Sequence, residues 1–237
     1  MLKPKNMIME NEKTWKQFKG KETPSSVEIN ELFFNNIPKG SEILDFGCAW
    51  GRIAFHLQKR GYNVTGFDLN QNAVETALKE AEKTNKKNIF QVQFHTANAM
   101  ELPYPDKSFD ACILQAFLTT IIKPEHRTLI LKEANRVLKD EGIIYLADFG
   151  QNWENPYYSQ RYERDFVKTG EMGTFIVTKK GKPQGKELFK AHHYTKEELM
   201  VLFEQVKKFK VEIVHETVFT TFQGNQTKGY IIIAKKI

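Results

Sequence analysis

One stretch of this 237-residue chain constrains its fold more than any other. An apolar run, residues 43–46, contains Asp45 and opens into a turn that holds Gly47 and Gly51; a second apolar run, about twenty residues on, ends at Asp68. Strand, glycine turn, helix and strand in this order form the βαβ unit that holds nucleoside-bearing ligands at the carboxyl ends of its strands. The two glycines permit a tight turn and a close approach of ligand to backbone. The stretch therefore predicts an α/β fold with a ligand site at this turn.

The glycine spacing restricts the kind of ligand. A dinucleotide fingerprint that begins at Gly47 needs glycines at positions 49 and 52, and the chain has Ala49 and Arg52 there. These side chains would block the pyrophosphate where it needs bare backbone, so we expect neither NAD nor FAD. What remains is D-x-G-x-x-x-G followed by Asp68, which is placed to accept hydrogen bonds from ribose hydroxyls.

These residues resemble the first motif of the class I S-adenosylmethionine-dependent methyltransferases, which usually have glycine where Ala49 stands. The next family block is similar to residues 94–110, where a short strand ends at Asn98 and a Leu-Pro loop leads to a fourth strand. Residues 137–148 match the helix end, turn and fifth strand. Residues 111–114 read as the buried fourth strand, so four blocks follow in the family's order over residues 41–149, and the chain resembles the family's small-molecule, ubiquinone/menaquinone-like members.

The resemblance implies S-adenosylmethionine as the cofactor. It implies that Asp45 contacts the methionine amino group, that Asp68 binds the ribose, and that the Asn98 carbonyl oxygen accepts from the adenine amino group. Gln115 follows strand four, where relatives place residues that face the transferred methyl group. The cofactor-binding residues we expect are Asp45, Gly47, Cys48, Ala49, Gly51, Asp68, Leu69, Asn98, Ala99, Met100 and Gln115.

The rest of the chain extends the α/β pattern. Helix patterns at residues 52–59, 72–83 and 125–138 alternate with apolar runs, which favours a mostly parallel sheet with helices on both faces. Residues 211–222 and 228–235 read as two further strands that form a hairpin. We therefore expect a Rossmann-like, seven-stranded, mostly parallel sheet with an antiparallel C-terminal strand.

Three segments fall outside this regular pattern. Residues 1–25 are polar apart from Trp15 and Phe18, and we expect a flexible N-terminal segment there, followed by one methyltransferase domain over residues 26–237. Ser25 and Ser26 have the character of helix caps. Residues 152–194 are rich in aromatic residues and glycine without clear periodicity, so we expect an inserted substrate lid after strand five. A capping box, T-K-E-E, then opens a helix that ends near residue 208.

The chemistry of methyl transfer requires mainly an aligned nucleophile and the exclusion of water. If the acceptor is a hydroxyl, a base assists, and His192 or His193 has a suitable ordinary pKa; the alternative is a solvated loop before the helix cap. Tyr157, with Tyr158 and Tyr162, is a candidate to line the acceptor pocket and to contact the sulfonium through its ring. These tyrosines equally suit simple packing of the lid. The catalytic candidates are therefore His193, His192 and Tyr157.

Absent motifs narrow the acceptor. No Asn/Asp-Pro-Pro-Tyr/Phe motif follows strand four, no Pro-Cys pair occurs, and no Cys/His cluster has zinc-ligand spacing. We therefore expect a small-molecule acceptor and no bound metal. One alternative is an RNA methyltransferase whose lysines, interleaved with Phe189 and Phe209, contact phosphates. Those lysines are Lys179, Lys180, Lys182, Lys186, Lys190, Lys207, Lys208 and Lys210. The other alternative is a non-catalytic S-adenosylmethionine-binding protein.

Bulk properties are typical of a cytoplasmic enzyme. No apolar run approaches the roughly 20 residues that a membrane-spanning helix needs, and the N-terminal residues lack an apolar signal core. The two cysteines, Cys48 and Cys112, fall in segments that we expect to be buried, which suits reduced thiols. The net charge of +6 leaves anionic partners open.

Overall fold

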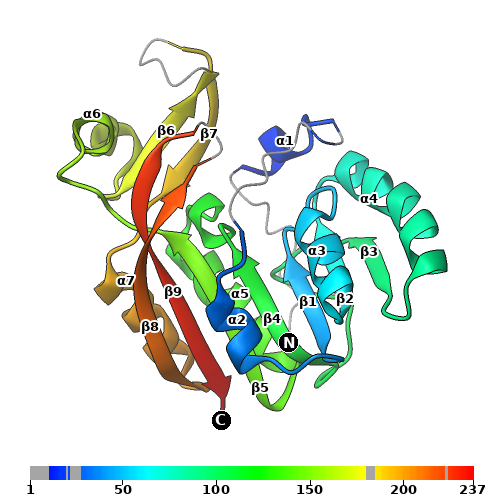
Figure 1. The fold of residues 1–237 in the computed structure, drawn as a ribbon. Helices are drawn as coiled ribbons and strands as arrows, with labels where there is room; N and C mark the ends of the chain where they lie inside the picture. The colour runs from blue at the N-terminus through cyan, green and yellow to red at the C-terminus, as the bar shows by residue number, and fades with distance from the viewer. Residues whose placement is uncertain (1–10, 20, 22–27, 180–184, 222–223) are drawn as a thin grey trace, which may run out of the picture.

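The computed structural model describes residues 11–19, 21, 28–179, 185–221 and 224–237 (Figure 1). Its centre is a seven-stranded sheet in the order β3-β2-β1-β4-β5-β9-β8. The strands are β1 (Glu42–Phe46), β2 (Asn63–Asp68), β3 (Val92–Thr96), β4 (Phe109–Gln115), β5 (Leu138–Phe149), β8 (Phe209–Thr220) and β9 (Gln226–Lys236). The pairs from β3 to β5 are parallel, and β9 runs antiparallel to both β5 and β8. The predicted mostly parallel sheet with an antiparallel C-terminal strand is confirmed.

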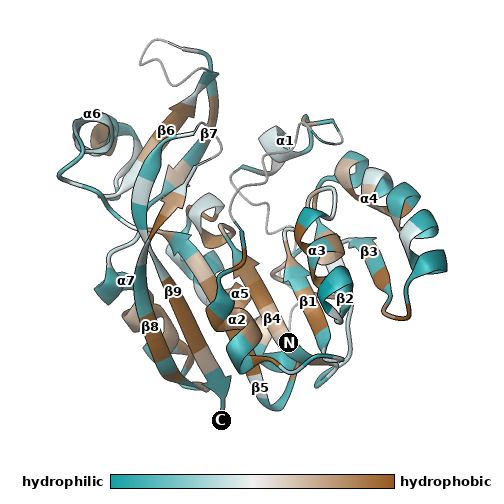
Figure 2. Cartoon of the chain, in the orientation of Figure 1, coloured by the Kyte–Doolittle hydropathy of each residue, from teal (hydrophilic) through white to brown (hydrophobic). Residues whose placement is uncertain are grey.

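Helices cover both faces of this sheet, as alternating side chains on each strand require. The helices α2 (Glu31–Asn36), α3 (Arg52–Arg60) and α4 (Gln71–Thr84) pack on one face around Ile43 and Ile113. The helices α5 (Pro124–Val137) and α7 (Lys196–Val206) pack on the other face around Leu44 and Leu114. Figure 2 shows hydrophobic residues on the central strand β4 and on β9, the second strand from one edge of the sheet. Two short 3-10 turns are η2 (Asn85–Lys87), which follows α4, and η3 (Leu118–Thr120), which follows β4.

The insertion after β5 folds into a small layer of its own. It consists of α6 (Pro156–Thr169) and a separate hairpin of β6 (Thr174–Thr178) and β7 (Glu187–His192), and it stands at one end of the large sheet (Figure 1). Asn155 caps α6 with its side chain, and Gly170 ends the helix at a positive φ of 71°. Periodicity did not reveal α6 because its buried face includes Arg161 and Asp165 as well as tyrosines.

The predicted helix starts have different outcomes. The capping box is confirmed, because the Thr195 side chain accepts from the backbone N–H of Glu198 and the Glu198 side chain accepts from the backbone N–H of Thr195. The cap residues Ser25 and Ser26 lie outside the described residues, and α2 begins later, with Asn30 as its N-cap. In the parts of the chain that the structure describes, no helix is long and apolar enough to cross a membrane.

The first described residues form a segment, residues 11–18, that we call the strap; it contains α1 (Glu12–Trp15). Most of the segment 1–25, which we expect to be flexible, lies outside the described residues. Figure 1 shows α1 between the hairpin β6–β7 and the end of the sheet that carries β1 and β2. The strap therefore joins parts of the fold that are far apart in the sequence.

Candidate functional site

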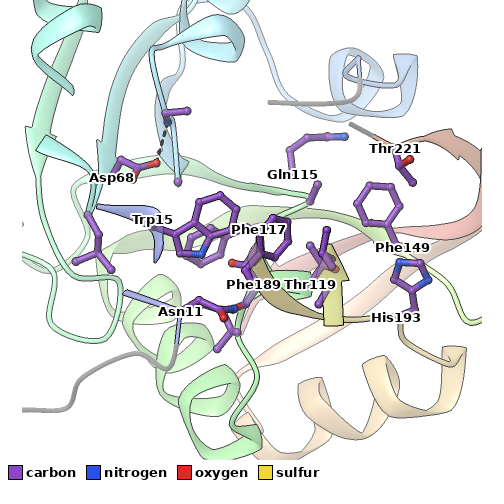
Figure 3. Close-up of a pocket in the computed structure, with 18 of the residues that line it drawn as sticks. Asn11, Trp15, Asp68, Gln115, Phe117, Thr119, Phe149, Phe189, His193 and Thr221 are labelled. Atoms are coloured by element: carbon purple, nitrogen blue, oxygen red, sulfur yellow. Dashed lines mark hydrogen bonds between the residues drawn. The ribbon is translucent and has the colours of Figure 1, made fainter. Parts of the chain in front are cut away.

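A cavity of about 190 Å³ opens at the carboxyl ends of β1, β2 and β4, beneath α6 and the hairpin β6–β7 (Figure 3). Parallel strands gather ligand-binding loops at this edge because every strand points its carboxyl end there. Of the predicted cofactor residues, the cavity lining includes Gly47, Cys48, Ala49, Asp68, Leu69, Ala99 and Gln115. The cavity lining does not include Asp45, Gly51, Asn98 and Met100.

The loop after β1 needs its glycines for steric reasons. Gly47 has a φ of +67°, and a Cβ there would lie 2.5 Å from Cδ2 of Phe117. Gly51 has a φ of +86°, and a Cβ there would lie 2.7 Å from Cζ of Phe94. Both positions therefore exclude a side chain, and the loop backbone stays bare toward the cavity.

Two alanines in this region have left-handed backbone, which is costly for a residue with a Cβ. Ala49 has a φ of 49°, and Ala116, directly after Gln115, has a φ of 50°. Both alanines line the cavity, from opposite loops. The geometry at Ala49 explains why relatives have glycine there, and backbone strain at two facing positions is typical of a ligand site.

Asp68, at the end of β2, is held by the loop that it faces. Its Oδ2 accepts from the backbone N–H of Ala49 at 2.9 Å, and its Oδ1 accepts from that of Asn70 at 2.8 Å. Burial raises the pKa of Asp68, while these backbone N–H groups and that of Leu69 lower it. The carboxyl group lines the cavity with lone pairs left to accept from a ligand.

Two buried polar side chains near the cavity lack partners among the described residues. Oδ2 of Asp45 and both amide atoms of Gln115 make no hydrogen bond, although the side chains are only 1% and 8% exposed. Asp45 is paired with Ile113 in the sheet, so Asp45 and Gln115 project from the same face of neighbouring strands. Burial, and then the charge of Asp68, raises the pKa of Asp45 to about 8.

Buried polar groups nearly always have hydrogen-bond partners, so these orphaned atoms fit a ligand group that brings both charge and hydrogen bonds. An α-amino acid end, with its ammonium and carboxylate, has this chemistry. Together with the ribose-binding geometry of Asp68 and the bare loop at Gly47, the residues present fit S-adenosylmethionine.

Asn98, the residue expected to contact the adenine amino group, does not line the cavity. The Oδ1 of Asn98 accepts from the backbone N–H of Met100 at 3.0 Å, and Asn98 is not part of the lining. Its neighbours Ala97 and Ala99 line the cavity instead, and Met100 is buried in the core. This corner of the cavity is therefore apolar. The side-chain carbonyl oxygen of Asn98 already accepts one hydrogen bond, from the backbone of Met100.

His193 lines the cavity directly after β7, and it is only 2% exposed. Its Nδ1 is 2.8 Å from the Tyr162 hydroxyl, and the rings of Phe149 and Phe175 pack against it. Burial, and then His192, lowers the pKa of His193 to about 3. The expectation that His193 has an ordinary imidazole pKa is wrong. With the lowered pKa the side chain is neutral at physiological pH and is a weaker base than a free imidazole.

His192 points away from the cavity into a buried polar network. Its Nδ1 is 2.7 Å from the Thr174 hydroxyl and 3.1 Å from Oε2 of Glu171. Glu171 in turn accepts two hydrogen bonds from the Arg127 guanidinium, at 2.8 and 2.9 Å. This network ties the lid to α5, so the structure separates His192 from His193. Neither histidine lies on a solvated loop, so that alternative is wrong.

Tyr157 lines the cavity, as expected. The guanidinium carbon of Arg161 lies 3.6 Å from the centroid of its ring, so one ring face already holds a cation. Tyr158 and Tyr162 are buried and pack the lid together with Phe175. Tyr158 also lines the cavity, so only Tyr162 serves packing without forming part of the lining.

Sequence reasoning missed the strap as a wall of the cavity. Asn11, 5% exposed, donates from Nδ2 to the carbonyls of Thr120 and Lys190 and accepts from the Lys190 N–H. Trp15 packs on Phe189 of β7, with ring centroids 4.8 Å apart, and both line the cavity (Figure 3). The one signal in the sequence was an apolar ring at Trp15 within a polar stretch.

The other end of the strap is fixed beside the carboxyl group of Asp68. The side chain of Asn70, two residues beyond Asp68, donates to the carbonyls of Trp15 and Phe18 at 2.8 and 2.9 Å. The strap therefore spans the cavity from the lid to the loop after β2.

The lysines considered for RNA binding do not gather on one face. Lys179 and Lys186 are paired at the tip of the hairpin β6–β7, whereas Lys207 and Lys210 flank the start of β8, near the C-terminus (Figure 1). Lys180 and Lys182 lie outside the described residues. Phe189 packs on Trp15 and Phe209 is buried, so neither aromatic ring is presented among these lysines.

Comparison with known proteins identifies the family of the chain. The family model of a methyltransferase domain matches residues 44–146. A solved SAM-dependent methyltransferase from Methanosarcina mazei is 37% identical, covers 89% of this chain and 99% of its own, and superposes with a TM-score of 0.83. A magnesium protoporphyrin IX methyltransferase from Synechocystis, solved with bound SAH, is 14% identical with a TM-score of 0.60, which shows likeness of fold alone.

Curated relatives match over shorter stretches. A ubiquinone/menaquinone biosynthesis C-methyltransferase from Rickettsia akari is 38% identical over 57% of this chain and 53% of its own length. A 27-O-demethylrifamycin SV methyltransferase from Amycolatopsis mediterranei is 36% identical over 46% of this chain and 39% of its own length. The chain thus spans about half, or less, of the length of these relatives. With the archaeal structure matched over nearly its whole length, the chain belongs to the class I S-adenosylmethionine-dependent methyltransferase family.

Proposed function

We propose that this protein binds S-adenosylmethionine and transfers its methyl group to a small, uncharged and largely apolar acceptor. The observation that carries the proposal is the orphaned pair Asp45 and Gln115 behind the bare glycine loop, next to the carboxyl group of Asp68. When bound, S-adenosylmethionine supplies a methyl group on a positively charged sulfur, which a nucleophile displaces in line.

Each part of the cavity has a role in this proposal. Asp68 accepts from the ribose hydroxyls, Asp45 and Gln115 receive the amino acid end, and the apolar corner at Ala97 and Ala99 takes the adenine ring. Residues 152–194 act as the lid, which with the strap excludes water from the transferred group. Positioning and water exclusion of this kind supply roughly 7–11 kcal/mol of barrier reduction in favourable cases.

The rest of the lining supports an uncharged acceptor. Eight phenylalanine, tyrosine and tryptophan rings line it, namely Trp15, Phe67, Phe117, Phe149, Tyr157, Tyr158, Phe175 and Phe189. Among the lining residues in the described ranges there is no lysine or arginine, although the chain has 35 of them. An anionic acceptor would lose its hydration there without gaining a counter-charge from a lysine or arginine of the lining, which is unfavourable. This lining and the dispersed lysines favour a small molecule over RNA.

The named relatives support the same acceptor class. The Rickettsia protein is a C-methyltransferase of ubiquinone/menaquinone biosynthesis, and the Amycolatopsis protein is a methyltransferase of 27-O-demethylrifamycin SV. A screen of candidate acceptors would identify the acceptor and the atom that is methylated.

Calorimetric titration with S-adenosylmethionine and S-adenosylhomocysteine tests the cofactor first. We expect micromolar binding that Asp68→Ala weakens tenfold or more, about 1.4 kcal/mol, and that Glu80→Ala, an exposed carboxylate on α4, leaves unchanged. Absence of binding by the wild type would contradict the proposal. Binding without turnover on neutral, anionic and tRNA acceptors would instead favour the non-catalytic alternative.

A further inference from the structure

The two ring nitrogens of His193 have different surroundings. Nδ1 is hydrogen-bonded to the hydroxyl of Tyr162 at 2.8 Å, inside the aromatic cluster of the lid. Nε2 makes no hydrogen bond within the described residues, and His193 belongs to the cavity lining (Figure 3). Nε2 is therefore the nitrogen that a ligand in the cavity can reach.

The protons around Tyr162 can be counted. Its hydroxyl oxygen receives a hydrogen bond from the backbone N–H of Asn152 at 3.3 Å. The hydroxyl has one proton to give, burial raises the pKa of Tyr162 so that this proton stays on, and Nδ1 of His193 is the acceptor in reach among the described residues. If Nδ1 carried a proton instead, the hydroxyl proton of Tyr162 would be buried without an acceptor among the described residues, which is unfavourable.

From this count we infer that Tyr162 fixes His193 as the tautomer with its proton on Nε2, so that His193 presents a hydrogen-bond donor, rather than a base, to an oxygen of the acceptor. The inference rests on the proposed function and narrows it. The acceptor is an uncharged, largely apolar molecule with a carbonyl, ether or hydroxyl oxygen that accepts from His193. Tyr162 is a positioning residue in this arrangement, because it acts through His193.

The surroundings of His193 support a donor. A histidine base usually gives its Nδ1 proton to a carboxylate or carbonyl, which leaves Nε2 bare for the substrate. Here the elements packed on His193 contribute Phe149 from β5, Tyr158 and Tyr162 from α6, and Phe175 from β6. None of these is a carboxylate, and Glu171 is engaged by His192 and Arg127 instead.

The tautomer is measurable without any acceptor. Long-range ¹H–¹⁵N correlation spectra of the full chain, with imidazoles labelled in ¹⁵N, distinguish a protonated from a bare ring nitrogen. His193→Gln assigns the signals. We expect a protonated Nε2 and a bare Nδ1 in the wild type from pH 5 to 8, and a mixture of tautomers in Tyr162→Phe. Tyr158→Phe, which removes a neighbouring hydroxyl not bonded to His193, keeps the wild-type tautomer.

A bare Nε2 or a doubly protonated ring at pH 7 would overturn the inference. Once turnover is found on an oxygen-bearing acceptor, His193→Gln, which keeps an N–H donor, should retain at least a third of kcat/KM, whereas His193→Phe should lose tenfold or more. Equal losses in both variants would reject the donor role. If Nε2 is protonated but no cofactor binds in calorimetry, the proposed function fails and the tautomer stands.

Discussion

Cofactor binding should release a proton from Asp45. With a pKa raised to about 8 by burial, this carboxyl group is protonated in most ligand-free molecules at neutral pH. A pKa one unit above the solution pH means a ratio of ten to one, so about nine molecules in ten carry the proton at pH 7. An ammonium group bound against Oδ2, which lacks a partner, stabilises the charged carboxylate and expels that proton.

The size of the effect follows from linkage. About 0.9 protons leave per ligand at pH 7, and the affinity rises by up to tenfold, about 1.4 kcal/mol, for each pH unit between 6 and 8. Above pH 8 the free protein is already ionised at Asp45, so the affinity levels off.

Calorimetry with S-adenosylhomocysteine in phosphate and in Tris, at the same pH, measures the released protons from the difference in apparent enthalpy. Asp45→Asn keeps the shape of the side chain but has no proton to lose, so its binding should be weaker and independent of buffer. Intact wild-type binding with equal enthalpies in the two buffers at pH 7 would refute the reasoning. Release that persists in Asp45→Asn would move the proton to another group, such as Asp68.

Three further predictions concern other parts of the site. Glu171→Gln should lower the free energy of unfolding by about 3 kcal/mol, because it leaves Arg127 buried without its ion pair; denaturant unfolding measures the loss. Although burial acts in the opposite direction, hydrogen bonds from His192 and Arg127 hold the pKa of Glu171 well below its usual range. The stability difference between the wild type and Glu171→Gln is therefore present at neutral pH and is lost only in strong acid. A difference that vanished near pH 5 would contradict the lowered pKa of Glu171. Ala49→Gly should raise the free energy of unfolding by up to about 1 kcal/mol, since it relieves left-handed backbone, and urea unfolding that shows a clear loss would count against strain there. Asn11→Ala removes three hydrogen bonds and should speed hydrogen exchange of residues 11–18 at least tenfold without lowering global stability; unchanged exchange would mean that the Asn11 contacts do not hold the strap.

The parts of the fold and site that sequence predicted are local in origin. The turn at Gly47 and the strand end at Asp68 are each specified by a few adjacent residues, and the alternation of helices and strands follows from their apolar spacing. The pKa of His193 was not predictable, because it depends on burial among aromatic rings from β5, α6 and β6, which are separate in the sequence. The strap contact was equally hidden, since Asn11 and Lys190 lie 179 residues apart.

That separation has a consequence for how the molecule is made. Asn11 of the strap leaves the ribosome 179 residues before its partner Lys190. Closing so long a loop carries an entropic cost that local elements avoid, so the wall at Trp15 should assemble after the sheet has formed. A wall that assembles last and rests on few contacts is also expected to detach first. Ligands can then enter and leave through transient release of the strap, while the strands that hold Asp45 and Asp68 stay folded.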